Sequence, residues 1–247
     1  MGTYQSNFKR YEEKYILNEE EYRNLIALVY TRLEYDNYKK YKICNIYFDT
    51  PSFDLIRESL EKPVYKEKLR LRSYGTPEES DRVFLEIKKK YDGIVYKRRI
   101  SLPYKDALNF CVNRKALPES SDVSPQIANE IGWFMTRYDL CPMVYLSYDR
   151  IAMKGIDDPN LRITFDSNIR WRAEQLDLSK GDFGSLKVAD NQYIMEIKTC
   201  GGMPIWLSDA LNSLRIYPKS YSKYGTIYKE DLAKNLIQEN TGGINCA

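Results

Sequence analysis

The sequence predicts an α+β fold in which β-strands dominate and form a sheet that closes, or nearly closes, on itself. Twenty-two tyrosines, many of them in alternating runs, favour strands because aromatic side chains pack well on a pleated surface. Eight segments alternate apolar and polar residues, which is the period of a half-buried strand. Polar turns separate these segments and few helical stretches intervene, so strands account for most of the expected regular structure.

The expected elements follow from these periodicities. Strands are predicted at Lys9–Leu17, Lys40–Asp49, Val64–Tyr74, Arg82–Lys90, Ile94–Pro103, Met143–Met153, Arg162–Ser167 and Tyr193–Thr199. Helical spacing of apolar residues predicts helices within 18–33, 52–60, 124–138 and 204–216, and a weaker one within 229–240. Asn18 and Glu21 fit the two partners of a capping box at the first helix. Residues 113–125 are the best linker candidate, but similar strands lie on both sides, so one domain over 1–247 is the simpler prediction.

The composition excludes several classes of function. The 38 basic and 35 acidic residues nearly cancel, which disfavours a protein that coats nucleic acid or membranes through a global excess of charge. The absence of histidine excludes Ser-His and Cys-His nucleophile pairs and a zinc site with histidine ligands. Any strongly basic feature must therefore be local.

Cysteine usage and the N-terminus predict a cytoplasmic location, either as a cytosolic protein or as the soluble part of a membrane-bound assembly. The five cysteines are widely spaced and include no C-x-x-C, which is typical of free thiols in a reducing compartment: Cys44, Cys111, Cys141, Cys200 and Cys246. The polar N-terminal stretch lacks the apolar core of a signal peptide. No apolar run reaches the roughly 18 residues that a membrane-spanning helix needs.

The stretch KLRLR shows the pattern on which the functional prediction depends. Lys68, Arg70 and Arg72 alternate with Leu69 and Leu71, so a strand places three cations on one face and two leucines on the other. The pattern recurs in six further segments, with shared faces formed by Arg10, Glu12 and Lys14; Glu86, Lys88 and Lys90; Lys97 and Arg99; Tyr148 and Arg150; Arg162, Thr164 and Asp166; Glu196 and Lys198.

A single strand of this kind is typical of a half-exposed sheet with a solvated charged face. The repetition favours a different interpretation, because the same face collects mainly lysine and arginine, and the guanidinium fork suits phosphate oxygens. If the sheet closes with these faces inward, about ten cations converge on one lumen, at a large cost unless a polyanion neutralises them. The sequence therefore predicts a phosphate-rich ligand.

Three carboxylates, Glu12, Glu86 and Glu196, lie among these cations. They either pair with neighbouring lysines and arginines or hold Mg²⁺ or Mn²⁺ beside phosphate oxygens, and the pattern leaves both interpretations open. The sequence contains neither a Walker A motif nor G-x-G-x-x-G, so the phosphates would be held by side chains of a β-sheet and not by a glycine-rich loop.

The ordered set YEEKY, KLRLRSYG, FLEIKKK, YKRRISL, YDRIA with LRITFD, MEIKT and YSKY resembles the polyphosphate polymerase (VTC) domain family of the triphosphate-tunnel (CYTH-like) superfamily. The resemblance runs from about Phe8 to Tyr228. It implies an antiparallel eight-stranded β-barrel that forms a basic tunnel, with helices packed outside. It also implies a metal-dependent phosphotransferase that uses Mn²⁺ or Mg²⁺ to move the terminal phosphate of ATP onto a growing polyphosphate chain.

The resemblance assigns roles position by position. It implies phosphate-binding or catalytic roles for Lys14, Arg70, Arg72, Lys88, Lys97, Tyr148, Arg150, Arg162, Ser222 and Lys223, and a metal-binding role for Glu196. The alternating faces add Arg10, Lys68, Arg99 and Lys198 as substrate-binding candidates, and Glu86 and Glu12 as candidates that assist at the metal.

One difference within the superfamily favours a polymerase. Its hydrolases and cyclases typically begin with E-x-E-x-K, whereas the matching positions here are Arg10, Glu12 and Lys14. The alternatives are a metal-dependent tunnel triphosphatase and a non-catalytic module that binds polyphosphate. The expected partners are ATP and polyphosphate or triphosphate, without nucleic acid and without a membrane span in this chain. A membrane partner is compatible with the sequence but is not indicated by it.

Overall fold

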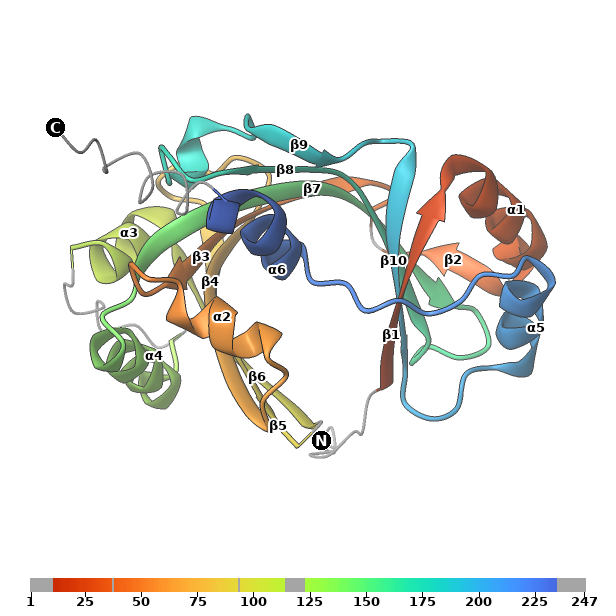
Figure 1. The fold of residues 1–247 in the computed structure, drawn as a ribbon, viewed down its shortest axis with the longest axis horizontal. Coiled ribbons are helices and arrows are strands. Elements are labelled where there is room, and N and C mark those ends of the chain that lie inside the picture. The colour runs from red at the N-terminus through yellow and green to blue at the C-terminus, as the bar shows by residue number, and fades with distance from the viewer. Residues whose placement is uncertain (1–10, 37, 93, 114–122, 235–247) are drawn as a thin grey trace, which may run out of the picture. The chain divides into compact units, whose positions relative to one another are not determined.

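The computed structural model describes residues 11–36, 38–92, 94–113 and 123–234. The strands are β1 (Tyr11–Asn18), β2 (Leu33–Tyr35), β3 (Tyr41–Asp49), β4 (Tyr65–Tyr74), β5 (Arg82–Tyr91), β6 (Ile94–Pro103), β7 (Cys141–Gly155), β8 (Arg162–Arg172), β9 (Ser185–Val188) and β10 (Gln192–Thr199). The helices are α1 (Glu19–Val29), α2 (Asp54–Leu60), α3 (Tyr104–Cys111), α4 (Pro125–Arg137), α5 (Ile205–Ser213) and α6 (Lys223–Ile227). The architecture is α+β and is dominated by antiparallel strand pairing (Figure 1).

The described residues form two compact units. The first unit comprises those within 1–42, 148–169 and 188–221, and the second comprises those within 43–147, 170–187 and 222–247. The strands β3, β7, β8 and β9 each contribute residues to both units. Closure of the strands into a barrel stays a prediction.

In the first unit, β10 pairs with β1 on one edge and with β8 on the other. The short strand β2 pairs with the last residues of β7. Helix α1 contacts β1, β10 and α5 (Figure 1). Buried side chains such as Leu25 of α1, Phe165 of β8 and Leu207 of α5 form one hydrophobic core, so the helices cover a single face of these strands.

The start of α1 follows the capping box that the sequence predicts. The Asn18 side chain accepts a hydrogen bond from the backbone N–H of Glu21, and the Glu21 carboxylate accepts one from the N–H of Asn18, both at 2.8 Å. The helix ends at Val29, earlier than predicted, and a 3₁₀ turn (Tyr30–Arg32) leads into β2. Aromatic and β-branched residues at this point have lower helix propensity, and strand pairing of β2 with β7 decides their conformation.

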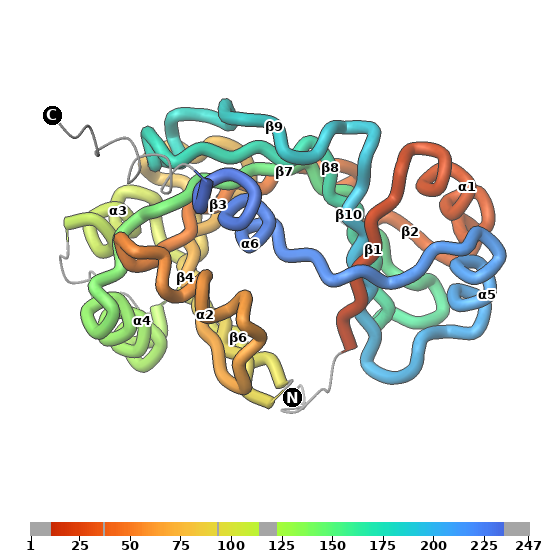
Figure 2. Tube along the Cα trace, in the orientation of Figure 1, coloured from red at the N-terminus to blue at the C-terminus, as the bar shows by residue number. Residues whose placement is uncertain are grey.

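In the second unit, β3, β4, β5 and β6 pair in that order as an antiparallel meander. The first part of β7 belongs to the same unit, and the Asn45 amide on β3 donates a hydrogen bond to the Leu146 carbonyl on β7 at 3.1 Å. Helix α3 contacts β5 and β6, and α4 contacts β6. Helix α2 contacts β4 and α6, which places α2 beside α6 in Figure 2.

The structure confirms all eight predicted strands and the predicted helices near residues 18–33, 52–60, 124–138 and 204–216, with shifted boundaries. Of the weaker terminal helix, only a π-helical turn (Tyr228–Leu232) and the residues up to 234 are described. Arg10, most of the candidate linker and Cys246 lie outside the described residues. The sequence did not predict β2, β9, α3 and α6; of these, β2, β9 and α6 have three, four and five residues, too few to show a clear period.

The helices of the described part of the chain are all too short or too polar to cross a membrane.

Candidate functional site

The central feature of the second unit is a face of β4–β6 on which cations are aligned in register. Four cross-strand rows make up this cation face: Arg72, Phe84 and Ser101; Arg70, Glu86 and Arg99; Lys68, Lys88 and Lys97; Lys66, Lys90 and Val95. Together the four rows contain eight lysines and arginines but only one carboxylate, that of Glu86. A face with this imbalance is suited to binding an anion of high charge.

The opposite face of the same strands explains the alternation. Leu69, Leu71, Leu85 and Ile87 are fully buried in the hydrophobic core of this unit. Because successive side chains of a strand point to opposite faces, burying these leucines forces the intervening cations onto one surface.

Glu86 lies at the centre of the cation face and is 2% exposed. Its Oε2 accepts a hydrogen bond from Arg70 Nε at 2.8 Å and pairs with Arg70 Nη2 at 2.7 Å. Arg72 Nε lies 3.8 Å from Oε2, and Lys97 Nζ lies 2.5 Å from Oε1. Burial works to raise the pKa of Glu86, but the charges of Arg70, Arg72 and Lys97 outweigh it and lower the pKa to about 2. The carboxylate is therefore fully ionised at neutral pH.

The two arginines are also held by neutral groups of β3. Arg72 Nε donates to the Asn45 side-chain oxygen at 3.0 Å, and the Arg72 side chain is buried. Arg70 Nη1 lies 3.4 Å from the Tyr47 hydroxyl. These contacts restrict the guanidinium groups, which reduces the entropy that ligand binding would cost.

The first unit carries a second group of candidate residues on β1, β10 and β8. Its rows place Glu12 opposite Lys198 and Arg162, and Lys14 opposite Glu196 and Thr164. Charges here are nearly balanced, in contrast to the cation face.

Contacts within this group hold its charged side chains. Lys14 Nζ pairs with Glu12 Oε1 at 3.5 Å and donates to the Tyr221 carbonyl at 3.1 Å. Lys198 Nζ lies 2.5 Å from Glu196 Oε1. The Arg162 side chain is 58% exposed, with Nη1 3.8 Å from Asp36.

Arg150 of β7 is fixed by a buried partner. Its Nε and Nη2 donate to the two carboxylate oxygens of Asp166 at 2.6 and 2.7 Å, and Asp166 is 0% exposed. Burial works to lower the pKa of Arg150, but the Asp166 carboxylate outweighs it and raises that pKa. The guanidinium also lies 5.2 Å from the ring centroid of Tyr148. The two predicted residues Tyr148 and Arg150 therefore lie together, oriented by Asp166.

Ser222 and Lys223 lie at the start of α6 in the second unit. The Ser222 side chain caps the helix by accepting a hydrogen bond from the Gly225 N–H at 3.2 Å. One residue further, the Tyr224 hydroxyl donates to Asp49 Oδ2 at 2.9 Å, and the Tyr224 ring stacks on Tyr47 with centroids 4.9 Å apart. These contacts fix the start of α6.

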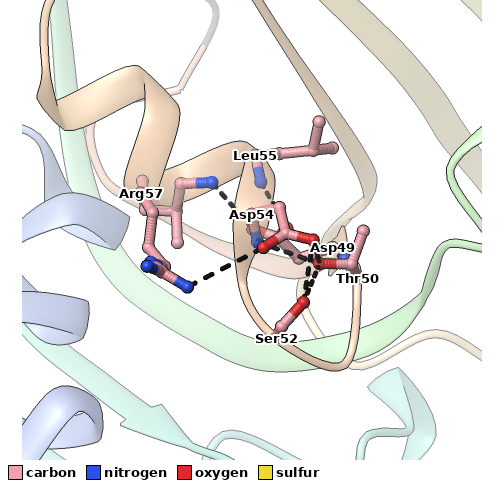
Figure 3. Close-up of polar contacts among 7 residues, drawn as sticks. Asp49, Thr50, Ser52, Asp54, Leu55 and Arg57 are labelled. Carbon is pink, nitrogen blue, oxygen red and sulfur yellow. Dashed lines mark hydrogen bonds and ion pairs between the residues drawn. The ribbon is translucent and has the colours of Figure 1, made fainter.

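Asp49 joins β3 to α2 through a tight turn (Figure 3). Its carboxylate is 0% exposed and accepts backbone N–H groups of Thr50, Leu55 and Ile56 at 2.9, 2.9 and 3.0 Å. Burial raises the pKa of Asp49, and these hydrogen bonds oppose the rise. Beside it, the Thr50 hydroxyl donates to Asp54 at 2.9 Å. No sequence pattern predicts the contacts of Asp49, because its partners are backbone N–H groups and the distant Tyr224.

The carboxylates differ in their fit to a divalent cation. Glu12 and Glu196 share a face and lie on neighbouring strands one row apart, so their oxygens are suitable ligands for Mg²⁺ or Mn²⁺. Within the described ranges, no three Asp, Glu or Cys side chains gather into a metal site. Proteins commonly hold Mg²⁺ with one or two carboxylates and substrate phosphates, so the pair fits this role. Glu86 fits it poorly because three cations surround its oxygens.

The structure thus brings the predicted residues together in two groups. The second unit assembles Lys68, Arg70, Arg72, Glu86, Lys88, Lys97 and Arg99 on the cation face, with Ser222 and Lys223 on α6. The first unit assembles Glu12, Lys14, Tyr148, Arg150, Arg162, Glu196 and Lys198. Arg10 lies outside the described residues. Lys66 was missed, although the alternation of KLRLR extends back to it.

Comparison with known proteins adds relatives from two trypanosomes. The chain is 28% identical over 162 residues to vacuolar transporter chaperone complex subunit 4 of Trypanosoma brucei brucei, a match that covers 56% of this chain and 20% of the relative. It is 24% identical over 215 residues to the subunit of the same name from Trypanosoma cruzi, which covers 69% and 26%. The chain spans about a fifth to a quarter of the length of these curated relatives.

Solved structures share the fold at low sequence identity. A candidate adenylate cyclase from Bacillus halodurans superposes with a TM-score of 0.54 at 15% identity, covering 89% of this chain and 96% of that one. A Hippeastrum protein, described as a candidate adenylyl cyclase with a dominant triphosphatase activity, gives 0.51 at 16% identity, covering 88% and 94%. The antiparallel, strand-dominated fold of this chain is therefore shared with these two proteins.

The VTC domain family matches residues 9–230, which include both groups of candidate residues. The resemblance seen in the ordered strand motifs is confirmed over nearly the whole chain. This chain belongs to the VTC domain family.

Proposed function

We propose that this chain is a metal-dependent phosphotransferase that moves the γ-phosphate of ATP onto a growing polyphosphate chain. The observation that carries the proposal is the cation face, where eight cations and one carboxylate lie in four rows. This excess of positive charge on one face of a sheet costs folding free energy unless an anion with several charges neutralises it. Nucleoside triphosphates and polyphosphate have this charge.

In this proposal, Arg70 and Arg72 hold phosphate oxygens of the nucleotide. Their guanidinium groups are already oriented by Glu86, Asn45 and Tyr47, so little reorganisation is needed when the ligand binds. The terminal phosphate oxygen of the acceptor attacks the γ-phosphorus of ATP, and the bond to the β-phosphate oxygen breaks to release ADP. No protein nucleophile is required, and catalysis consists of positioning and stabilising charge on the transferred phosphoryl group.

Glu196, assisted by Glu12, would hold Mn²⁺ or Mg²⁺. The metal would neutralise charge on the phosphates that it contacts. Lys14 and Lys198, which pair with these carboxylates, would then be available to bind phosphate oxygens. Within the same unit, Arg150 of β7 and Arg162 of β8 would add phosphate-binding side chains. In the second unit, Lys223 of α6 is a further phosphate-binding candidate.

A product assay tests the proposal. The purified chain is incubated with ATP and Mn²⁺, and the products are separated on a urea gel stained for polyphosphate. A ladder that disappears in Glu196→Gln supports a metal-dependent polymerase. Glu130→Gln is the matched control, because Glu130 is likewise a carboxylate held by cations, Lys89 and Arg98, but these lie on the opposite face of β5 and β6.

Two other outcomes would refute polymerisation. Release of free phosphate without a ladder would identify a triphosphatase. Binding of triphosphate with no turnover of ATP would identify a non-catalytic polyphosphate-binding module.

A further inference from the structure

The last row of the cation face contains two lysines that face each other. Lys66 on β4 pairs in register with Lys90 on β5, next to the row of Lys68 and Lys88. Like charges directly opposite on a sheet are destabilising. Both lysines are half-buried. This arrangement costs folding free energy in the absence of a ligand.

No carboxylate in the described part of the chain pairs with either ammonium group. Lys66 Nζ donates only to the backbone carbonyl of Ser59 at 3.2 Å. The pKa of Lys66 is lowered, first by burial and then by the charges of Lys90, Lys88 and Lys62. Within the described residues, Lys66 and Lys90 therefore lack a carboxylate partner, in contrast to Arg70, which pairs with Glu86.

The position of this row separates it from the arginines. Lys66 precedes Arg70 by four residues, which corresponds to roughly 14 Å along a strand. A triphosphate held at Arg70 and Arg72 contains three phosphorus atoms and is too short to extend over the Lys66–Lys90 row as well. A longer linear chain of phosphates would contact both.

We propose that Lys66 and Lys90 form a subsite for phosphate units beyond the third, through which the protein prefers long phosphate chains to triphosphate. The inference rests on the proposed function in that it takes the cation face as the binding site of the phosphate chain. It makes Lys66 and Lys90 binding residues and gives them no part in the transfer step.

Equilibrium binding tests the inference without any turnover. The affinities of wild type and of the Lys66→Gln/Lys90→Gln double variant are measured for two ligands, inorganic triphosphate and a medium-chain linear polyphosphate. The double variant should bind the long chain about three- to tenfold more weakly, and its affinity for triphosphate should not change. The dependence of long-chain affinity on salt concentration should also become shallower, because fewer cations contact the ligand. Lys105→Gln on α3 is the control, a lysine paired with Glu79 outside the cation face, and it should match wild type.

Several results would overturn the inference. Equal losses for both ligands would mean that the row belongs to the triphosphate site, and an unchanged long-chain affinity would mean that it binds no phosphate. If the double variant also lost the same factor in affinity for an oligonucleotide of similar charge, the row would bind polyanions in general. The single variant Lys90→Gln repeats the comparison if the double variant does not fold. The wild-type protein could bind long polyphosphate through this row and still make no polymer. That result would disprove the proposed activity but would support the subsite.

Discussion

Glu86 is expected to stabilise the fold as a counter-ion, and the substitution Glu86→Gln tests this role. The folded protein lowers the pKa of Glu86 from 4.5 to about 2. A difference of this size corresponds to roughly 3 kcal/mol of folding free energy, since each pKa unit is worth about 1.4 kcal/mol. Because Glu86 is 2% exposed, solvent screens its interactions little.

The sign of the effect follows from the direction of the shift. A depressed pKa means that the ionised carboxylate stabilises the folded state at any pH above its value in the unfolded chain, near 4.5. This stabilisation is lost as the pH falls from 4.5 towards 2. The free energy of unfolding of wild type should therefore drop by roughly 3 kcal/mol across this window through Glu86 alone.

Urea unfolding at a series of pH values measures this contribution. Glu86→Gln should be less stable than wild type at neutral pH by about 3 kcal/mol, and the difference should shrink as the pH falls below about 4. Glu130→Gln should keep the steep wild-type loss in that range. Parallel pH curves for wild type and Glu86→Gln would refute the reasoning. If Glu86 were a metal ligand instead, its substitution would weaken Mn²⁺-dependent turnover as Glu196→Gln is expected to do.

Three further substitutions probe contacts that orient the candidate residues. Asp166→Asn should cost about 3–5 kcal/mol in urea unfolding, because it leaves the Arg150 side chain, which is 13% exposed, without the charge of its fully buried partner; a loss below 1 kcal/mol would contradict a strong ion pair. Asn18→Ala should lower the free energy of unfolding by about 1 kcal/mol through loss of the α1 cap, and Asn18→Asp should restore it. Tyr224→Phe should cost about 1–2 kcal/mol, because it removes a hydrogen bond to the buried carboxylate of Asp49, and an unchanged melting temperature would show that this bond is not formed.

The strands and one face of each could be predicted because the information is local. Residues two apart in a strand share a face whatever the rest of the chain does, so KLRLR alone predicts three aligned cations and a buried pair of leucines. The capping box of Asn18 and Glu21 is equally local, since both partners lie within one helical turn. Short elements such as β2 and β9 have too few residues for a period, and tertiary contacts decide their conformation.

The order of residues is enough to identify the family, the strands along the chain and the charged face of each strand. Which of these charges pair with one another depends on the folded chain. Glu86 meets cations from β4 and β6, so its role as a counter-ion depends on strand register, and Lys66 faces Lys90 for the same reason. The bond between Asp49 and Tyr224 joins residues 175 positions apart, and no local pattern encodes it. Ion pairs and hydrogen bonds depend on the distance between side chains, and for residues far apart in the sequence this distance is set only when the chain folds.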